Sequence, residues 1–185
     1  MAKRPTRRKT RPGRPPSAPR GEPQRSAHET TLRRADDDGW ELVPPRCAGE
    51  REDDLAEVRE MIAAGETEVA RDELRWLLEE CHDLLEAHRL LGEIALAEDD
   101  LPLARGHFGY AVRIGQLAIG RSGGPRPVPY RLPANQAFHE SGKGLVWCLL
   151  KLGKRDLAVE IVEQFTACDP ADPLGLRRLL EVTSA

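Results

Sequence analysis

The sequence has few aromatic residues and no long apolar run. Phe, Trp and Tyr make up 4% of the 185 residues, whereas hydrophobic residues as a whole make up 39%, so any core is aliphatic. The longest apolar run, 145–150, is far shorter than the ~20 residues of a transmembrane helix. The N-terminus is basic but lacks the apolar stretch of a signal peptide. We therefore expect neither a membrane-spanning helix nor a secretory signal.

Cysteine is scarce and shows no metal-binding spacing. The chain has four cysteines, and none belongs to a Cys-x-x-Cys pair. A chain of this length can fold without disulfides, so free thiols and a reducing compartment are expected. Arg outnumbers Lys 23 to 5, which is typical of a GC-rich bacterial genome and favours a cytoplasmic location. The four cysteines are Cys47, Cys81, Cys148 and Cys168.

Catalytic motifs are absent. The run 141–144 contains a Gly-Lys step but lacks the upstream glycine and the following Ser or Thr of a phosphate-binding loop. No Gly-x-Ser-x-Gly nucleophile elbow occurs. Cys81, His82 and His88 are close in sequence, but no second cluster of metal-ligating residues accompanies them. We expect no enzyme activity, no cofactor and no metal.

What the sequence does have is a division of charge. Residues 1–27 hold nine Lys or Arg against one acid, a net charge of +8, which leaves −11 for the rest of a chain whose total is −3. The same segment has six prolines and only four apolar residues, which predicts a disordered basic tail. Residues 28–50 are predicted as a linker. Its Trp40 either docks on the folded body or forms an exposed recognition motif.

From residue 51 to residue 184 the apolar residues follow a helical period. Ala70, Leu74 and Leu77, for example, recur at i, i+4 and i+7, which predicts an amphipathic helix. The stretch 120–133 has three glycines and four prolines, so it is predicted as an insertion loop. The fold class expected for 51–184 is all-α.

A repeat of 34 residues relates parts of this helical region. Ala70 and Ala104 are 34 residues apart, and Ala158 follows Ala104 after 54, which is one period plus a 20-residue insertion. Leu91-Gly92 followed by Ala104, Phe108 and Ala111 is similar to the signature of the tetratricopeptide repeat (TPR) family. The repeat-packing positions are Ala70, Gly92, Ala104, Phe108, Ala111 and Ala158.

The resemblance implies an α-solenoid of about three helix pairs and a short C-terminal capping helix. A helical bundle without repeats is the alternative. In the TPR family the first helix of each pair lines a concave groove that holds peptides, so the resemblance implies a non-catalytic scaffold or adaptor for a protein or peptide partner. The implied groove residues here are Leu55, Arg59, Ile62, Glu86, Arg89, Glu93, Leu96, Lys143, Trp147 and Lys151.

Within this set, Arg89 and Lys143 are candidates for holding a carboxylate of the partner. Trp147 is either a core residue or a binding anchor, because Trp is enriched at the energetic centres of interfaces.

The basic tail supports an alternative function. Its run 11–16, Arg-Pro-Gly-Arg-Pro-Pro, resembles an AT-hook, an extended segment that lies in the DNA minor groove. A tail of this kind would contact DNA or RNA, although it could also be merely solvated or fold back on the acidic body. The sequence does not fix an oligomeric state. The candidate nucleic-acid contacts are Arg7, Arg8, Lys9, Arg11 and Arg14.

Overall fold

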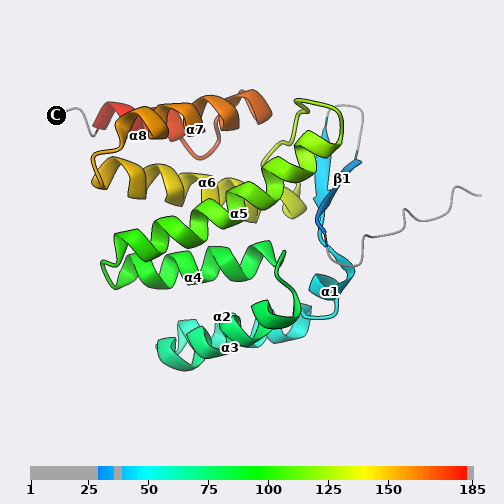
Figure 1. Ribbon diagram of the computed structural model, residues 1–185, viewed down its shortest axis with the longest axis vertical. Helices are drawn as coiled ribbons and strands as arrows, with labels where there is room; N and C mark the ends of the chain where they lie inside the picture. The colour runs from blue at the N-terminus through cyan, green and yellow to red at the C-terminus, as the bar shows by residue number, and fades with distance from the viewer. Residues whose placement is uncertain (1–28, 36–38, 183–185) are drawn as a thin grey trace, which may run out of the picture.

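The computed structural model describes residues 29–35 and 39–182, and helices dominate it (Figure 1). The all-α prediction holds for these residues except for one two-stranded sheet. None of their helices combines the length and the apolar character that a membrane crossing requires. The elements are β1 (Thr31–Arg34), β2 (Trp40–Val43), α1 (Arg46–Gly49), α2 (Glu52–Ala63), α3 (Thr67–Glu80), α4 (Leu85–Ala97), α5 (Leu101–Arg121), α6 (Pro133–Lys151), α7 (Arg155–Cys168) and α8 (Leu176–Val182).

Helices α2 to α7 follow one another along the chain, and each helix packs on the next. Helix α4 also contacts α6, and α8 packs on both α6 and α7. Glycines in the left-handed region end two of the helices: Gly65 follows α2 at φ 82° and Gly153 follows α6 at φ 70°. Asp100 caps the N-terminus of α5, because its side chain accepts a hydrogen bond of 3.0 Å from the Leu103 N–H.

Small residues allow the paired helices to approach closely. Ala70, Ala104 and Ala158, the three alanines of the repeat register, are completely buried. A Cβ added at Gly92 of α4 would lie 2.7 Å from the Phe108 ring, and one at Gly144 of α6 would lie 2.6 Å from the same ring. Phe108 therefore fills the space between α4 and α6.

Residues 28–50, predicted as a linker, contain an antiparallel hairpin and α1. The hairpin pairs Thr31 with Val43, and Leu42 is buried. The fully buried Asn135, at the start of α6, accepts a hydrogen bond from the Leu42 N–H and donates to the Trp40 carbonyl, both at 2.9 Å. The Trp40 ring is partly buried, and the Arg126 guanidinium carbon lies 5.0 Å from its centre.

The insertion loop is held against the body. It spans residues 122–132, slightly less than the predicted 120–133, because α5 continues to Arg121. The Val128 N–H donates to the Cys168 carbonyl at 3.0 Å, and the Trp40 N–H donates to the Pro127 carbonyl at 2.8 Å. The loop therefore joins the hairpin to the C-terminal end of α7.

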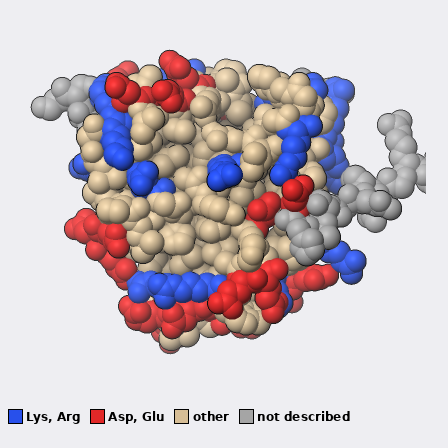
Figure 2. Space-filling model, viewed as in Figure 1, with Lys and Arg blue, Asp and Glu red and all other residues tan. Residues whose placement is uncertain are grey.

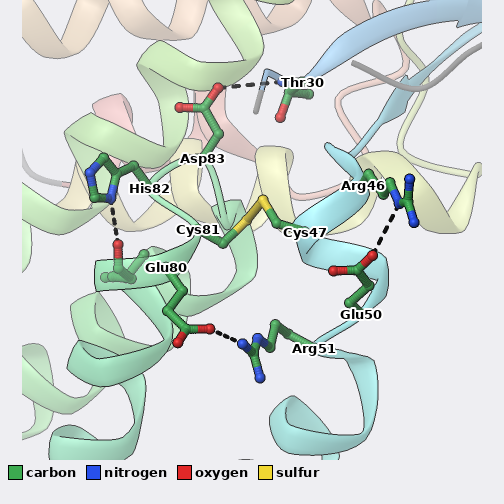
Figure 3. The surroundings of a disulfide bond; sticks show 10 residues. Thr30, Arg46, Cys47, Glu50, Arg51, Glu80, Cys81, His82 and Asp83 are labelled. Carbon is green, nitrogen blue, oxygen red and sulfur yellow. Dashed lines mark hydrogen bonds and ion pairs between the residues drawn. A yellow bond between two sulfur atoms is a disulfide. The ribbon is translucent and has the colours of Figure 1, made fainter. Parts of the chain in front are cut away.

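The prediction of four free thiols is wrong for two of the cysteines. Cys47 of α1 and Cys81, which follows α3, form a disulfide with their Cα atoms 5.7 Å apart (Figure 3). Cys148 and Cys168 are free. The bond ties α1 to the turn between α3 and α4, a contact that only the tertiary structure creates. The argument from free thiols to a reducing compartment does not apply to this pair.

Candidate functional site

Two cavities lie along α4 and α6, and α2 also lines the first of them. The first has a volume of about 500 Å³ and is also bordered by the hairpin and α1. The second has a volume of about 490 Å³ and is also bordered by α8 and the residues before it. Glu140 of α6 lines both cavities. We call the two cavities together the groove.

Most of the residues implied by the TPR resemblance line the groove. Ile62 lines neither cavity, and Lys151 lies beside the second, with its Nζ 4.8 Å from the centre of the Trp147 ring. The structure thus brings together side chains that are up to 92 residues apart in sequence. Leu55, Arg59, Glu86 and Arg89 line the first cavity, and Glu93, Leu96, Lys143 and Trp147 line the second.

Arg89 is the centre of an ion-pair network at the junction of the cavities. Its Nε donates to Glu86 at 2.8 Å, its Nη1 lies 3.4 Å from Glu140, and it also pairs with Glu93. Arg59 reaches the same Glu86 at 2.9 Å. The Arg89 side chain is only 13% exposed, and its Nε, Nη1 and Nη2 atoms each already contact a carboxylate of the chain. The prediction that Arg89 holds a partner's carboxylate is not supported by this geometry.

The network changes the acidity of its members. Burial raises the pKa of the Glu86 carboxyl, but the hydrogen bonds and charges of Arg89 and Arg59 outweigh it and leave the pKa below its usual value. For Glu93, burial and the nearby charges of Glu86 and Glu140 outweigh the attraction of Arg89, so its pKa is raised. Glu86 is therefore held as a carboxylate, and the groove keeps negative charge.

Trp147 is not a core residue. Its side chain is 38% exposed and lines the second cavity beside Lys143, with Leu174 and Leu179 also in the lining. Lys143 is exposed and has no ion-pair partner among the residues described. The second cavity therefore offers an aromatic ring, apolar side chains and an available cation.

The hairpin side of the first cavity was missed by sequence reasoning. Thr30, Leu42, Pro44 and Ala48 line it, although they fall in the predicted linker. Thr30 is 3% exposed, and its Oγ1 has no hydrogen-bond partner within the described residues. No local pattern signals this side, because Asn135 positions β2 from 93 residues away.

The insertion loop borders the groove without covering it. None of residues 122–132 lines either cavity. Tyr130 of the loop contacts the groove lining, because its hydroxyl donates to Glu140 at 3.1 Å. Its N–H donates to Asp169 at 2.9 Å. The loop thus supports the wall at Glu140 rather than closing the groove.

The remaining candidates do not join this site. His88 of α4 lies against α5, with its Nδ1 3.4 Å from that of His107, and Cys81 is bonded to Cys47. No group of three or more His, Cys, Asp or Glu in 29–35 and 39–182 is arranged to hold a metal ion. The nucleic-acid candidates Arg7, Arg8, Lys9, Arg11 and Arg14 lie outside the described residues.

Comparison with protein-family models, with curated proteins and with solved structures finds no match to this chain. The function is therefore argued from the geometry of the groove.

Proposed function

We propose that the chain is a non-catalytic adaptor that holds a peptide segment of a protein partner in the groove. The helix pairs α2–α3, α4–α5 and α6–α7 then act as degenerate TPR-like repeats, with α8 as the cap. The observation that carries the proposal is that one cavity, lined by α2, α4 and α6, and a second, lined by α4 and α6, share Glu140 in their linings. A partly apolar concave surface with a few charged groups is the usual form of a ligand site.

The second cavity defines the chemistry of the partner. The half-exposed Trp147 ring and Leu179 suit an apolar side chain, and Lys143 suits a carboxylate beside it. Arg89 is committed to Glu86, Glu93 and Glu140, so Lys143 takes over the role that the sequence assigned to both cations. The partner segment is expected to carry an apolar anchor next to an acidic residue.

Trp147→Ala tests the groove. Full-length protein is used as bait, and the recovered partners are identified and quantified by mass spectrometry. We expect recovery of the specific partner to fall at least tenfold, since truncating an aromatic anchor that the partner covers costs about 2 kcal/mol or more of binding free energy. Lys143→Glu should weaken the same partner through charge repulsion.

Trp76→Ala is the matched control. Trp76 of α3 is 44% exposed, similar to Trp147, but lines neither cavity. It should leave partner recovery unchanged. If the Trp147 and Lys143 variants both retain every partner of the wild type, the groove assignment is wrong.

The alternative is a nucleic-acid-associated protein that uses its basic tail. The net charge of +8 in residues 1–27 and the AT-hook-like run 11–16 favour it. DNA and RNA retention against salt, measured with and without the five basic residues from Arg7 to Arg14, separates the two functions. A cytoplasmic location stays a prediction, and it rests on the arginine-rich composition now that Cys47 and Cys81 are bonded.

A further inference from the structure

The N-terminal tail is attached to the chain at the wall of the first cavity. Thr30, the second described residue, lines that cavity, and its N–H lies 3.4 Å from an oxygen of Asp83. Arg25 precedes Thr30 by five residues, so covalent geometry keeps their Cα atoms within about 18 Å. The residues that directly precede Thr30 are therefore tethered within reach of this cavity.

The negative charge of the body is concentrated in residues 52–100, which include two of the helices that line this cavity, α2 and α4. Residues 52–100, which form α2, α3, α4 and the turns between them, hold 17 acids and four bases. Residues 101–185 hold 11 bases and seven acids, so they are net positive. Figure 2 shows acidic side chains gathered along the lower edge of the molecule, where Figure 1 places α2 and α3. The charge of the body is thus opposite to that of the tail where the tail is attached.

The lining of the first cavity holds more negative than positive charge, which favours a basic ligand. Three carboxylates, Glu52, Glu86 and Glu140, face two guanidinium groups that are already paired with Glu86. Glu52 is exposed and has no ion-pair partner in the described part of the chain. The site therefore has a carboxylate at its rim that is available to an incoming cation.

Thr30 gives a second, independent indication of a ligand. Its Oγ1 is buried at the cavity wall without a hydrogen-bond partner among residues 29–35 and 39–182, and leaving a buried hydroxyl unsatisfied is unfavourable. The backbone N–H and C=O groups of an extended segment would satisfy it. The exposed apolar lining residues, such as Pro44 and Ala134, suit proline rings and the aliphatic stems of arginine.

We propose that residues 1–28 bind in the first cavity of their own chain, so that this part of the groove is self-occupied until a polyanion or a partner displaces the tail. Because a segment tethered this closely has an effective concentration in the millimolar range, even a weak contact suffices. The occupant is a basic, proline-containing segment, for which the tail has the charge and the composition. The proposal shares the first cavity with the proposed adaptor function but does not involve Trp147.

Photo-cross-linking in the full-length chain tests the proposal. The photoreactive residue p-benzoylphenylalanine replaces Pro16, which is 14 residues from Thr30 and so can reach most of the surface. Mass spectrometry then maps the intramolecular cross-links. We expect them to concentrate on the first cavity, at residues such as Pro44 and Gln136, and to disappear in 1 M salt, where charges are screened within about 3 Å.

Two charge reversals provide the comparison. Glu52→Lys, at the rim of the cavity, should reduce the cross-link yield at least fivefold. Glu160→Lys makes the same change of net charge at an exposed position of α7 and should reduce it less than twofold. Equal reductions, cross-links spread over the whole surface, or cross-links between two copies would each overturn the proposal. None of these outcomes affects the Trp147 test, so the two proposals can fail separately.

Discussion

At the scale of single residues, each phenylalanine of this chain packs against a glycine. The chain has three phenylalanines, all of them buried. A Cβ added at any of the facing glycines would lie within 2.7 Å of a ring atom, a distance that Cβ atoms do not tolerate. The few aromatic residues therefore occupy space that missing side chains leave open. The facing pairs are Gly92 and Gly144 with Phe108, Gly115 with Phe138, and Gly142 with Phe165.

Gly92→Ala should destabilise the protein because its new methyl group would collide with the Phe108 ring. The expected cost is about 1–3 kcal/mol in the free energy of unfolding, the usual range for overpacking a core. The measurement is urea denaturation followed by circular dichroism.

Gly106→Ala is the control for that experiment. Gly106 also lies in a helix, α5, but nothing is within 4 Å of its added Cβ. Alanine is the better helix former, so this change should stabilise the protein by about 0.5–1 kcal/mol. If both substitutions lowered the free energy of unfolding by a similar amount, the contact with Phe108 would not be the cause.

Part of this packing could be predicted from the sequence. The repeat register identified Gly92, Ala104 and Phe108 as packing residues, and all three lie at the interface of α4 and α5. Gly144 was not identified, although it contacts the same ring. Periodicity shows which face of a helix is buried, but not which residue of a distant helix lies opposite.

At the scale of elements, a histidine lies between α4 and α5. The His88 ring is centred 4.4 Å from the ring of Tyr110, and its Nδ1 lies 3.4 Å from that of His107. Burial, together with the charge of His107, lowers the pKa of His88 to about 4. The packing of the two helices therefore favours neutral His88.

This shift predicts a loss of stability in mild acid. The pKa of His88 in the folded protein lies below the ~6.5 of an unfolded chain. What His88 contributes to the free energy of unfolding is therefore complete above pH 6.5 and is lost as the pH falls toward 4. At pH 5 the loss from His88 is about 2 kcal/mol. His88→Gln, compared with the wild type by urea denaturation at pH 7.5 and pH 5, should remove that part of the loss.

The other buried histidines set the background of this measurement. Burial lowers the pKa of His107 and of His139 as well, so some acid sensitivity should remain in the variant. A variant with the full acid sensitivity of the wild type would contradict the assignment to His88.

Helices and their ends were predictable, whereas the hairpin was not. The breaks at Gly65 and Gly153 and the loop near 120–133 follow from residues that cannot continue a helix. The four-residue strand β2 has no comparable local signal, since Asn135 and the insertion loop hold it in place. Equivalent positions of the repeat can also be exposed: Val69, Leu103 and Leu157 occupy the same register, and each is exposed to solvent.

At the scale of the whole molecule, the core is divided. One buried cluster belongs to α1, α2, α3 and most of the length of α4, and a larger one includes β2 and extends from the end of α4 through α8. In a stack of repeats, each unit is stabilised mainly by its neighbours, so the terminal pair is the first to open. Here the pair α2–α3 is joined to the rest through α4 and through the Cys47–Cys81 bond.

The same division limits what the sequence could show about the site. The TPR resemblance implied the groove residues on α2, α4 and α6, and most of them line the two cavities, although Ile62 does not. The disulfide does not follow from it: only the folded chain brings Cys47 and Cys81, 34 residues apart, to a Cα separation of 5.7 Å. The hairpin side of the first cavity depends on the same tertiary contacts.

Reduction of the disulfide should therefore loosen one end of the molecule selectively. Closing a loop of 34 residues stabilises a protein by about 3–4 kcal/mol in the chain-entropy model. With a dithiol reductant present, amide hydrogen exchange in α2 and α3 should speed up at least tenfold, while exchange in α5 and α6 changes little, because the larger cluster is intact. A double variant, Cys47→Ser with Cys81→Ser, should show the fast exchange without reductant and no further change with it. Uniform acceleration across all helices would mean that the chain unfolds as one unit, and that the division of its core has no energetic consequence.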